Sequence, residues 1–180
     1  MEVSPFTDEM KFYILKNNPL LLEECEEWDF LNPPFDLVPF AESLVALIHE
    51  KGGLGVAANQ CGFPYRIFAM RGTPENYVMV NPRIVNLSGD NIELEEACLS
   101  YPGLIVSKKR SQHCRVRFQG PDGETYTKQF TGMTARVVQH EMDHLNGKPF
   151  WSGISRIKFD IAIRKAYKRG YNVSNIYYKG

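Results

Sequence analysis

The chain has 180 residues, of which 43% are hydrophobic and 23% charged, a composition that excludes wholesale disorder and fits one domain with a sizeable core. Basic and acidic side chains balance at 21 each, so no global field points to DNA or a membrane as the main partner. No apolar run reaches membrane-spanning length, and the first five residues resemble neither a signal peptide nor a transit peptide. We therefore expect a single domain over residues 1–180 in a reducing, cytosol-like compartment, with an organelle as the open alternative and all four cysteines as free thiols.

The first predicted element is a helix, because apolar residues recur at i, i+3, i+4 and i+7 from Leu37 to Ile48. Two glycines at 52 and 53 end it. From Leu54 to Phe130 the pattern changes to short β-prone runs, and Gln119–Glu124 has the composition of a turn between two of them. The runs are Tyr65–Met70, Tyr77–Val80, Arg83–Val85, Leu104–Val106 and Arg115–Phe118.

A second helix is predicted between Thr131, a candidate N-cap, and Gly147. A third follows at about 155–169, in a tail from Ser155 onwards that carries seven basic residues and one acidic residue, a net charge of +6. The tail indicates either a solvated helix face or a contact with RNA or another acidic partner. The fold class is therefore α+β: a central helix packed against mostly antiparallel β-sheets, with an N-terminal helix region and a C-terminal helix.

The second helix contains the pattern H-E-x-x-H at 140–144. Residues four apart share a helix face, so the rings of His140 and His144 project towards one point, and Glu141 lies beside them. Two hydrogen-bonded core histidines would be the structural alternative. However, both rings lie on an apolar stripe with Met133 and Val137, where burial is costly unless each ring finds a partner, and a shared divalent ion meets that demand.

The third ligand has to come from upstream. Phe150 stands where one class of metalloprotease has its third histidine, and no glutamate follows Glu141. A thiolate beside two imidazoles is chemically favoured. The residues alone do not choose among the four cysteines, His49, His113 and the upstream carboxylates.

Three segments together resemble the peptide deformylases. They are Gly53–Gln60 (G-L-G-V-A-A-N-Q), Glu96–Ser100 (E-A-C-L-S) and Gln139–His144 (Q-H-E-M-D-H), which match in order the family patterns G-φ-G-φ-A-A-x-Q, E-G-C-φ-S and Q-H-E-x-D-H. The resemblance covers about residues 15–150. It implies a hydrolase that removes the formyl group from the initiator methionine of nascent chains and releases formate.

By this resemblance, Cys98 supplies the thiolate ligand beside the two histidines, and Glu141 acts as general base and acid while activated water attacks the formyl carbon. The Gln60 amide and the backbone N–H of Leu99 would donate to the formyl oxygen, a role for which fixed donors are well suited. Gly53 and Gly55 would let the substrate backbone approach closely.

Further residues are expected to bind the methionine side chain or to face the substrate. Those for the apolar pocket are Leu54, Leu94, Met133 and Val137. Ala97 departs from the family, which has glycine there, and its methyl group could crowd the substrate. The resemblance further implies one divalent ion, Fe(II) in the cell and Zn(II), Ni(II) or Co(II) in purified samples, and a ribosome contact through the basic C-terminal helix.

Two other functions compete with this interpretation. A deformylase-like protein could bind metal or formyl-peptides without turnover. This alternative is suggested by Ala97, which stands where the family has glycine. A zinc endopeptidase is suggested by H-E-x-x-H alone, but it lacks a downstream third ligand.

Overall fold

The computed structural model describes residues 12–179, so the first five residues and the ends of the expected 1–180 domain lie outside the described part. Within it, five strands form one antiparallel sheet in the order β1-β2-β3-β4-β5. The expected α+β class is confirmed. No helix in residues 12–179 is long and apolar enough to cross a membrane. The elements are η1 (Pro19–Leu22), α1 (Leu37–Lys51), β1 (Gly55–Ala57), η2 (Ala58–Cys61), β2 (Ile67–Met70), β3 (Tyr77–Cys98), β4 (Tyr101–Gln119), β5 (Thr125–Thr131), α2 (Gly132–Leu145) and α3 (Arg156–Lys168).

Helix α1 begins and ends as its sequence predicts. The Asp36 side chain accepts a hydrogen bond from the backbone N–H of Val38, which satisfies one of the unpaired donors of the first turn. Gly52 ends the helix in the left-handed conformation with a φ of 67°. The residues of α1 that are buried are those of the predicted stripe: Leu37, Phe40, Ala41, Leu44, Leu47 and Ile48.

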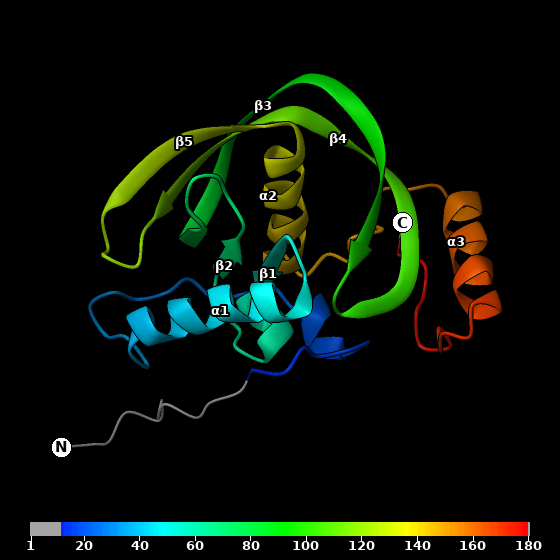
Figure 1. Ribbon diagram of the computed structural model, residues 1–180, viewed down its shortest axis with the longest axis horizontal. Helices are drawn as coiled ribbons and strands as arrows, with labels where there is room; N and C mark the ends of the chain where they lie inside the picture. The colour runs from blue at the N-terminus through cyan, green and yellow to red at the C-terminus, as the bar shows by residue number, and fades with distance from the viewer. Residues whose placement is uncertain (1–11, 180) are drawn as a thin grey trace.

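Strand β2 is buried on both faces because a helix covers each of them. Ile67 and Ala69 belong to the core under α1, whereas Phe68 and Met70 belong to the core around α2. Successive residues of a strand point to opposite faces, so this alternation places β2 between the two helices. Figure 1 shows α2 standing beneath the arch of the sheet and α1 lying across its lower end. The two helices and β2 thus form the centre of the molecule.

The first β-prone run contains the separate strand β2, whereas the four later runs, predicted as separate short strands, are joined into the two long strands β3 and β4. Strands β3 and β4 pair along most of their length and arch over α2 (Figure 1), with register shifts such as the one between Val80 and Arg83 bending the pair. Residues 85–95 of β3 are exposed throughout. No buried face imposes an apolar alternation there, so the pattern could not show that the strand continues. The turn predicted at Gln119–Glu124 is confirmed between β4 and β5.

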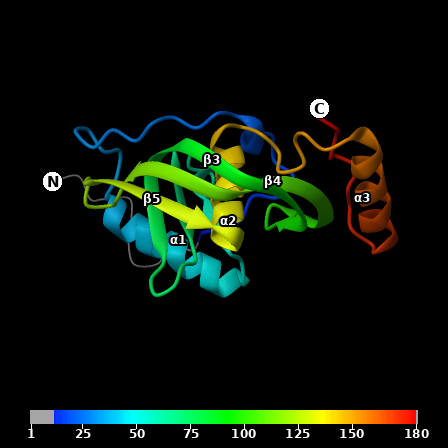
Figure 2. The same ribbon diagram turned by 90° about the horizontal axis from the view of Figure 1, so that it is seen from above.

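The two later helices also match their predictions. Thr131 occupies the N-cap of α2, although its side chain makes no capping hydrogen bond. The Ser155 side chain caps α3 by accepting from the backbone N–H of Lys158. Helix α3 stands at one end of the molecule and packs against β4 (Figure 2). Its apolar side contributes Phe159, Ala162 and Ala166 to a cluster with Trp151.

Replacing Leu44 by alanine tests the packing of α1 on the sheet. This side chain has no exposed surface, so its truncation removes apolar burial and leaves a cavity. We expect the free energy of unfolding in urea to fall by about 2–5 kcal/mol. Val38→Ala on the same helix, where the side chain is 51% exposed, should change it by less than about 0.5 kcal/mol. Equal losses in both variants would contradict the assigned face.

Candidate metal centre

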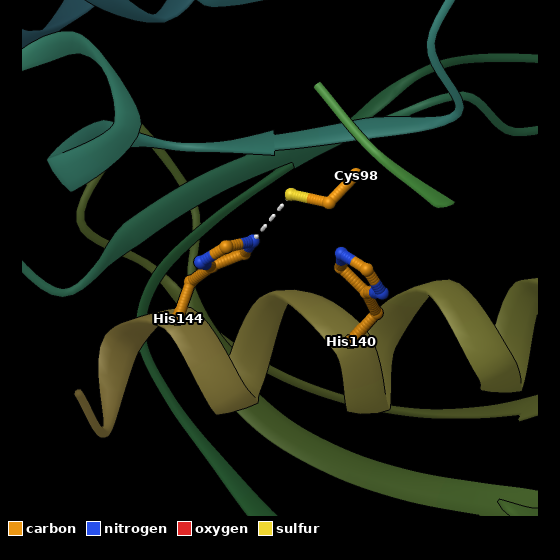
Figure 3. A group of neighbouring side chains, drawn as sticks. All are labelled: Cys98, His140 and His144. Atoms are coloured by element: carbon orange, nitrogen blue, oxygen red, sulfur yellow. Dashed lines mark hydrogen bonds between the residues drawn. The ribbon is translucent and has the colours of Figure 1, made fainter. Parts of the chain in front are cut away.

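Helix α2 and the end of β3 bring three potential metal ligands together. The ligand atoms of Cys98, His140 and His144 all lie within 4.8 Å of one another. Both rings project from one face of α2 towards the cysteine sulfur (Figure 3). Cys98 Sγ lies 3.2 Å from His144 Nε2. The structure therefore offers Cys98, at the end of β3, as the candidate for the third ligand that the helix motif left open, and His49 and His113 are not part of this group.

Each imidazole is prepared differently for this role. His140 Nδ1 lies 3.0 Å from Glu96 Oε2, and donation of its proton to that carboxylate leaves Nε2 as the electron-pair donor. His144 Nδ1 is buried and has no hydrogen-bond partner among the described residues. Burial, with the positive charges nearby, holds the pKa of His144 well below its usual value, so the ring is neutral and can coordinate an ion.

The Cys98 thiol completes a donor set that fits a divalent metal. Burial and the carboxylates of Glu141 and Glu96 raise the pKa of this thiol, despite hydrogen bonds from the backbone of Ser100 and Tyr101. A metal ion that replaces the proton would instead lower the pKa of this thiol, because metals bind the thiolate. One sulfur and two nitrogens are also the protein ligands of known catalytic sites that keep a position open. The residues present therefore fit a single divalent ion.

Glu96 is the centre of a buried ionic network that supports these ligands. It accepts hydrogen bonds from Arg110, Arg136 and His140. Although burial alone would raise its pKa, the Arg110 and His140 contacts hold the pKa of Glu96 far below the usual value. The carboxylate stays ionised and fixes the His140 ring. Arg110 also pairs with Asp143 at 2.9 Å, which ties β4 to α2.

The Gln60 amide has a defined orientation. Its Oε1 accepts a hydrogen bond from the backbone N–H of Ala57 at 2.9 Å. Its Nε2 donates to Ser100 Oγ at 3.0 Å and lies 3.5 Å from Cys98 Sγ. Because the oxygen is held by the backbone, the NH2 group is directed at the sulfur side of the site. A donor in that position is available to a substrate oxygen.

Glu141 is buried beside the ligands, and its Oε2 has no hydrogen-bond partner among the described residues. Burial raises the pKa of this carboxyl to about 8, with Arg110 opposing and Glu96 and Asp143 reinforcing the rise. Gly55 makes room for it, since a Cβ there would lie 2.5 Å from Glu141 Oε1 and 2.9 Å from Val137 Cγ1. The glycine that was expected to admit a substrate backbone thus also admits the carboxylate.

A cavity of about 390 Å³ opens on to these groups. Leu94, which was expected to line it, does not: this side chain is 42% exposed on the arch of β3. No role was predicted for Arg136, whose side chain does line the cavity. Arg136 lies four residues before His140 and shares its helix face. A search for apolar residues on that face does not select it, because its side chain is charged. The predicted residues on the lining are Gly53, Leu54, Gly55, Gln60, Ala97, Cys98, Leu99, Met133, Val137, His140 and Glu141.

Comparison with known proteins matches residues 12–160 to the family model for polypeptide deformylase. The chain belongs to the peptide deformylase family. A peptide deformylase of Wolbachia pipientis subsp. Culex pipiens (strain wPip) is 35% identical over 153 residues, which cover 78% of this chain and 80% of the relative. As the deformylases are metal-dependent enzymes, the fitted donor set and the family agree.

Two crystal structures of deformylases have the same fold. One from Legionella pneumophila has a TM-score of 0.80 and 28% identity, covering 89% of this chain and 96% of its own. A class I type b peptide deformylase from Acinetobacter baumannii, solved with Met-Ala-Ser bound, has a TM-score of 0.74 and 30% identity, covering 81% of this chain and 99% of its own.

Substituting Cys98 by serine tests the donor set. A serine hydroxyl is a much poorer ligand for a soft divalent ion than a thiolate, so the metal content after dialysis against a chelator should fall to less than about a tenth. Cys25→Ser, which alters another buried thiol outside the ligand group, should retain its metal. Metal per chain is measured by elemental analysis on samples whose circular dichroism shows a folded protein. Retention by the Cys98 variant would show that another residue is the third ligand.

Proposed function

We propose that the cavity binds the formylated N-terminus of a nascent chain and that the enzyme hydrolyses the formyl–methionine amide, releasing formate. The orientation of the Gln60 amide carries the proposal. Its NH2 group, directed at Cys98, is a donor with no metal-binding function of its own, and such a donor suits the oxygen of a formyl group undergoing attack. The Acinetobacter relative, solved with Met-Ala-Ser, has in its crystal a peptide that begins with methionine.

The ligands proposed for the ion are Cys98, His140 and His144. When bound, a divalent ion supplies a Lewis acid that makes water more acidic and polarises a carbonyl group. Fe(II) is the proposed ion in the cell, and Zn(II), Ni(II) or Co(II) could occupy purified samples, since a site of one sulfur and two nitrogens accepts all four.

Glu141 is the proposed proton carrier. Its carboxylate lies beside the ligand group, lines the cavity and is excluded from solvent, so it can take a proton from attacking water and return it to the departing amine. Gln60 and the backbone N–H of Leu99 would stabilise negative charge on the former formyl oxygen, and one such donor is typically worth about 3 kcal/mol.

The remaining residues would position the peptide. Gly53 and Leu54, which directly precede β1, line the cavity, and so does Ala97 near the end of β3. An extended substrate between these segments would add a strand to the hairpin. Met133 and Val137 offer apolar surface about two turns and one turn before His140, respectively. Leu94 lies outside the cavity and is left out of the proposed pocket.

Formate release from formyl-Met-Ala-Ser is the direct test, with anaerobically loaded Fe(II). We expect Glu141→Gln to lower kcat by at least about a hundredfold, because the amide cannot accept the proton. The metal content should be unchanged. Glu42→Gln, an exposed carboxylate on α1, is the matched control and should retain activity.

The other outcomes of this assay separate the competing functions. A folded, metal-loaded native protein that binds the peptide without releasing formate would be a binding protein without turnover. Cleavage of an internal peptide bond would indicate an endopeptidase. Full activity in Glu141→Gln would remove this residue from the mechanism.

The basic C-terminal helix is the proposed contact with the ribosome, which would place the reaction in the cytoplasm, where nascent chains emerge. The side chains of Arg164, Lys165, Lys168 and Arg169 are exposed, and none forms an ion pair among the described residues. Phosphates of ribosomal RNA would attract such a cluster.

Reversing three of these charges tests the contact without removing the apolar side of α3. Arg164→Glu, Lys165→Glu and Lys168→Glu combined should lower co-sedimentation with ribosomes at least about tenfold, because each phosphate contact is lost and repulsion is added. Formate release from a free tripeptide should not change. Undiminished co-sedimentation would rule out this surface.

A further inference from the structure

Arg136 is a charged residue in the wall of an otherwise largely apolar part of the cavity. It lines the cavity together with Met133 and Val137, one turn of α2 before His140, while only 6% of its side chain is exposed. Charged side chains are rarely buried unless they are paired. The hydrogen-bond partners of Arg136 must therefore compensate its buried charge.

The partners hold the Arg136 guanidinium in one place. One terminal nitrogen, NH1, donates to Glu96 Oε1 at 2.6 Å and to the backbone oxygen of Lys108 at 3.0 Å. The other donates to the backbone oxygen of Ile92. These acceptors lie on β3 and β4, so the guanidinium connects the central helix to both strands of the arch. A planar group held by three acceptors has little freedom to move aside for a ligand.

The charge of Arg136 is already compensated by the Glu96 carboxylate. The residue is therefore not a binding site for an acidic side chain, which would have to compete with a buried ion pair. What it offers to the cavity is a polarised, rigid surface. A thioether gains more from such a surface than a hydrocarbon of equal length does, because sulfur is polarisable and a weak hydrogen-bond acceptor.

We propose that Arg136 is a specificity-determining residue: it closes the end of the pocket for the substrate's first side chain and favours the methionine sulfur over a hydrocarbon of equal length. The inference rests on the proposed function, which places the formyl group at the metal ligands. If the formyl carbon lies beside His140, the side chain of the formylated substrate residue would extend towards the preceding turn of α2. Arg136, Val137 and Met133 line the cavity there. One helical turn spans about 5.4 Å.

Arg110 offers a matched control. It binds the same Glu96 carboxylate as Arg136 and is equally buried, but it does not line the cavity. Loss of either arginine disturbs the support of His140, so both should affect turnover of every substrate. Only loss of Arg136 should alter the choice between substrates.

The experiment compares formyl-methionine and formyl-norleucine tripeptides, since norleucine replaces the sulfur by a methylene. The measured quantity is the ratio of kcat/KM for the two substrates in the metal-loaded enzyme. The native protein should favour methionine by about three- to tenfold, the scale of a contact with a soft sulfur. Arg136→Met should bring the ratio close to one, whereas Arg136→Lys, which keeps the charge, should retain part of the preference.

Arg110→Met and the milder Arg110→Lys should lower kcat/KM for both substrates by the same factor and leave the ratio at its native value. Thermal unfolding identifies which variants are folded, and Arg136→Lys provides the measurement if Arg136→Met is not. A native ratio of one, or a ratio that is unchanged in the folded Arg136 variants, would overturn the inference. No formate from the native enzyme with either substrate would instead contradict the proposed function.

Discussion

Glu96 is a buried anion on the strand that faces the central helix, and two arginines and a histidine ring hydrogen bond to it. Removing a charge from water is costly, and the cost is offset only while all its partners stay in place. The network therefore fixes how α2 lies against β3 and β4. It also fixes the position of Cys98, two residues further along β3, relative to His140.

The same arrangement explains why the site lies between the helix and the hairpin. The strands β3 and β4 reverse direction at Leu99 and Ser100, so the sulfur of Cys98 is presented from the end of a hairpin. On the opposite side, Gly55 lets the short strand β1 approach α2 so closely that a Cβ at this position would collide with the side chains of Glu141 and Val137. A buried carboxylate and an oriented amide are thereby enclosed with the ligands, where water is largely excluded and electrostatic contacts are strong.

Much of this could be predicted from the sequence, because helical patterns act locally. The α1 stripe, the glycine that ends α1 and the H-E-x-x-H face of α2 each depend on residues a few positions apart. The candidate third ligand, Cys98, lies 42 positions before His140, and local patterns do not encode that proximity; the family resemblance indicated it. The length of β3 was hidden because its arch is exposed and has no alternating burial.

The network around Glu96 could not be predicted for a related reason. A charged residue such as Arg136 is not expected on the apolar face of a helix. Its burial is explained only by its acceptors on β3 and β4, which are distant in sequence. Glu96 belongs to the middle family motif, but its role as a buried, ionised carboxylate depends on Arg110, which comes 14 positions later. Leu94 was expected in the cavity, whereas its side chain is 42% exposed on the arch and does not line the cavity.

The apolar cluster that anchors α3 includes Cys98 and Tyr101 as well as Phe150, whose ring centroid lies 5.4 Å from that of His140. The C-terminal helix thus shares its apolar cluster with Cys98, one of the three candidate metal ligands. A ligand that binds only the native state stabilises that state by mass action, to an extent that depends on its free concentration relative to its dissociation constant. A metal ion bound by this group would therefore also favour the docked C-terminal helix over the unfolded chain that proteases attack.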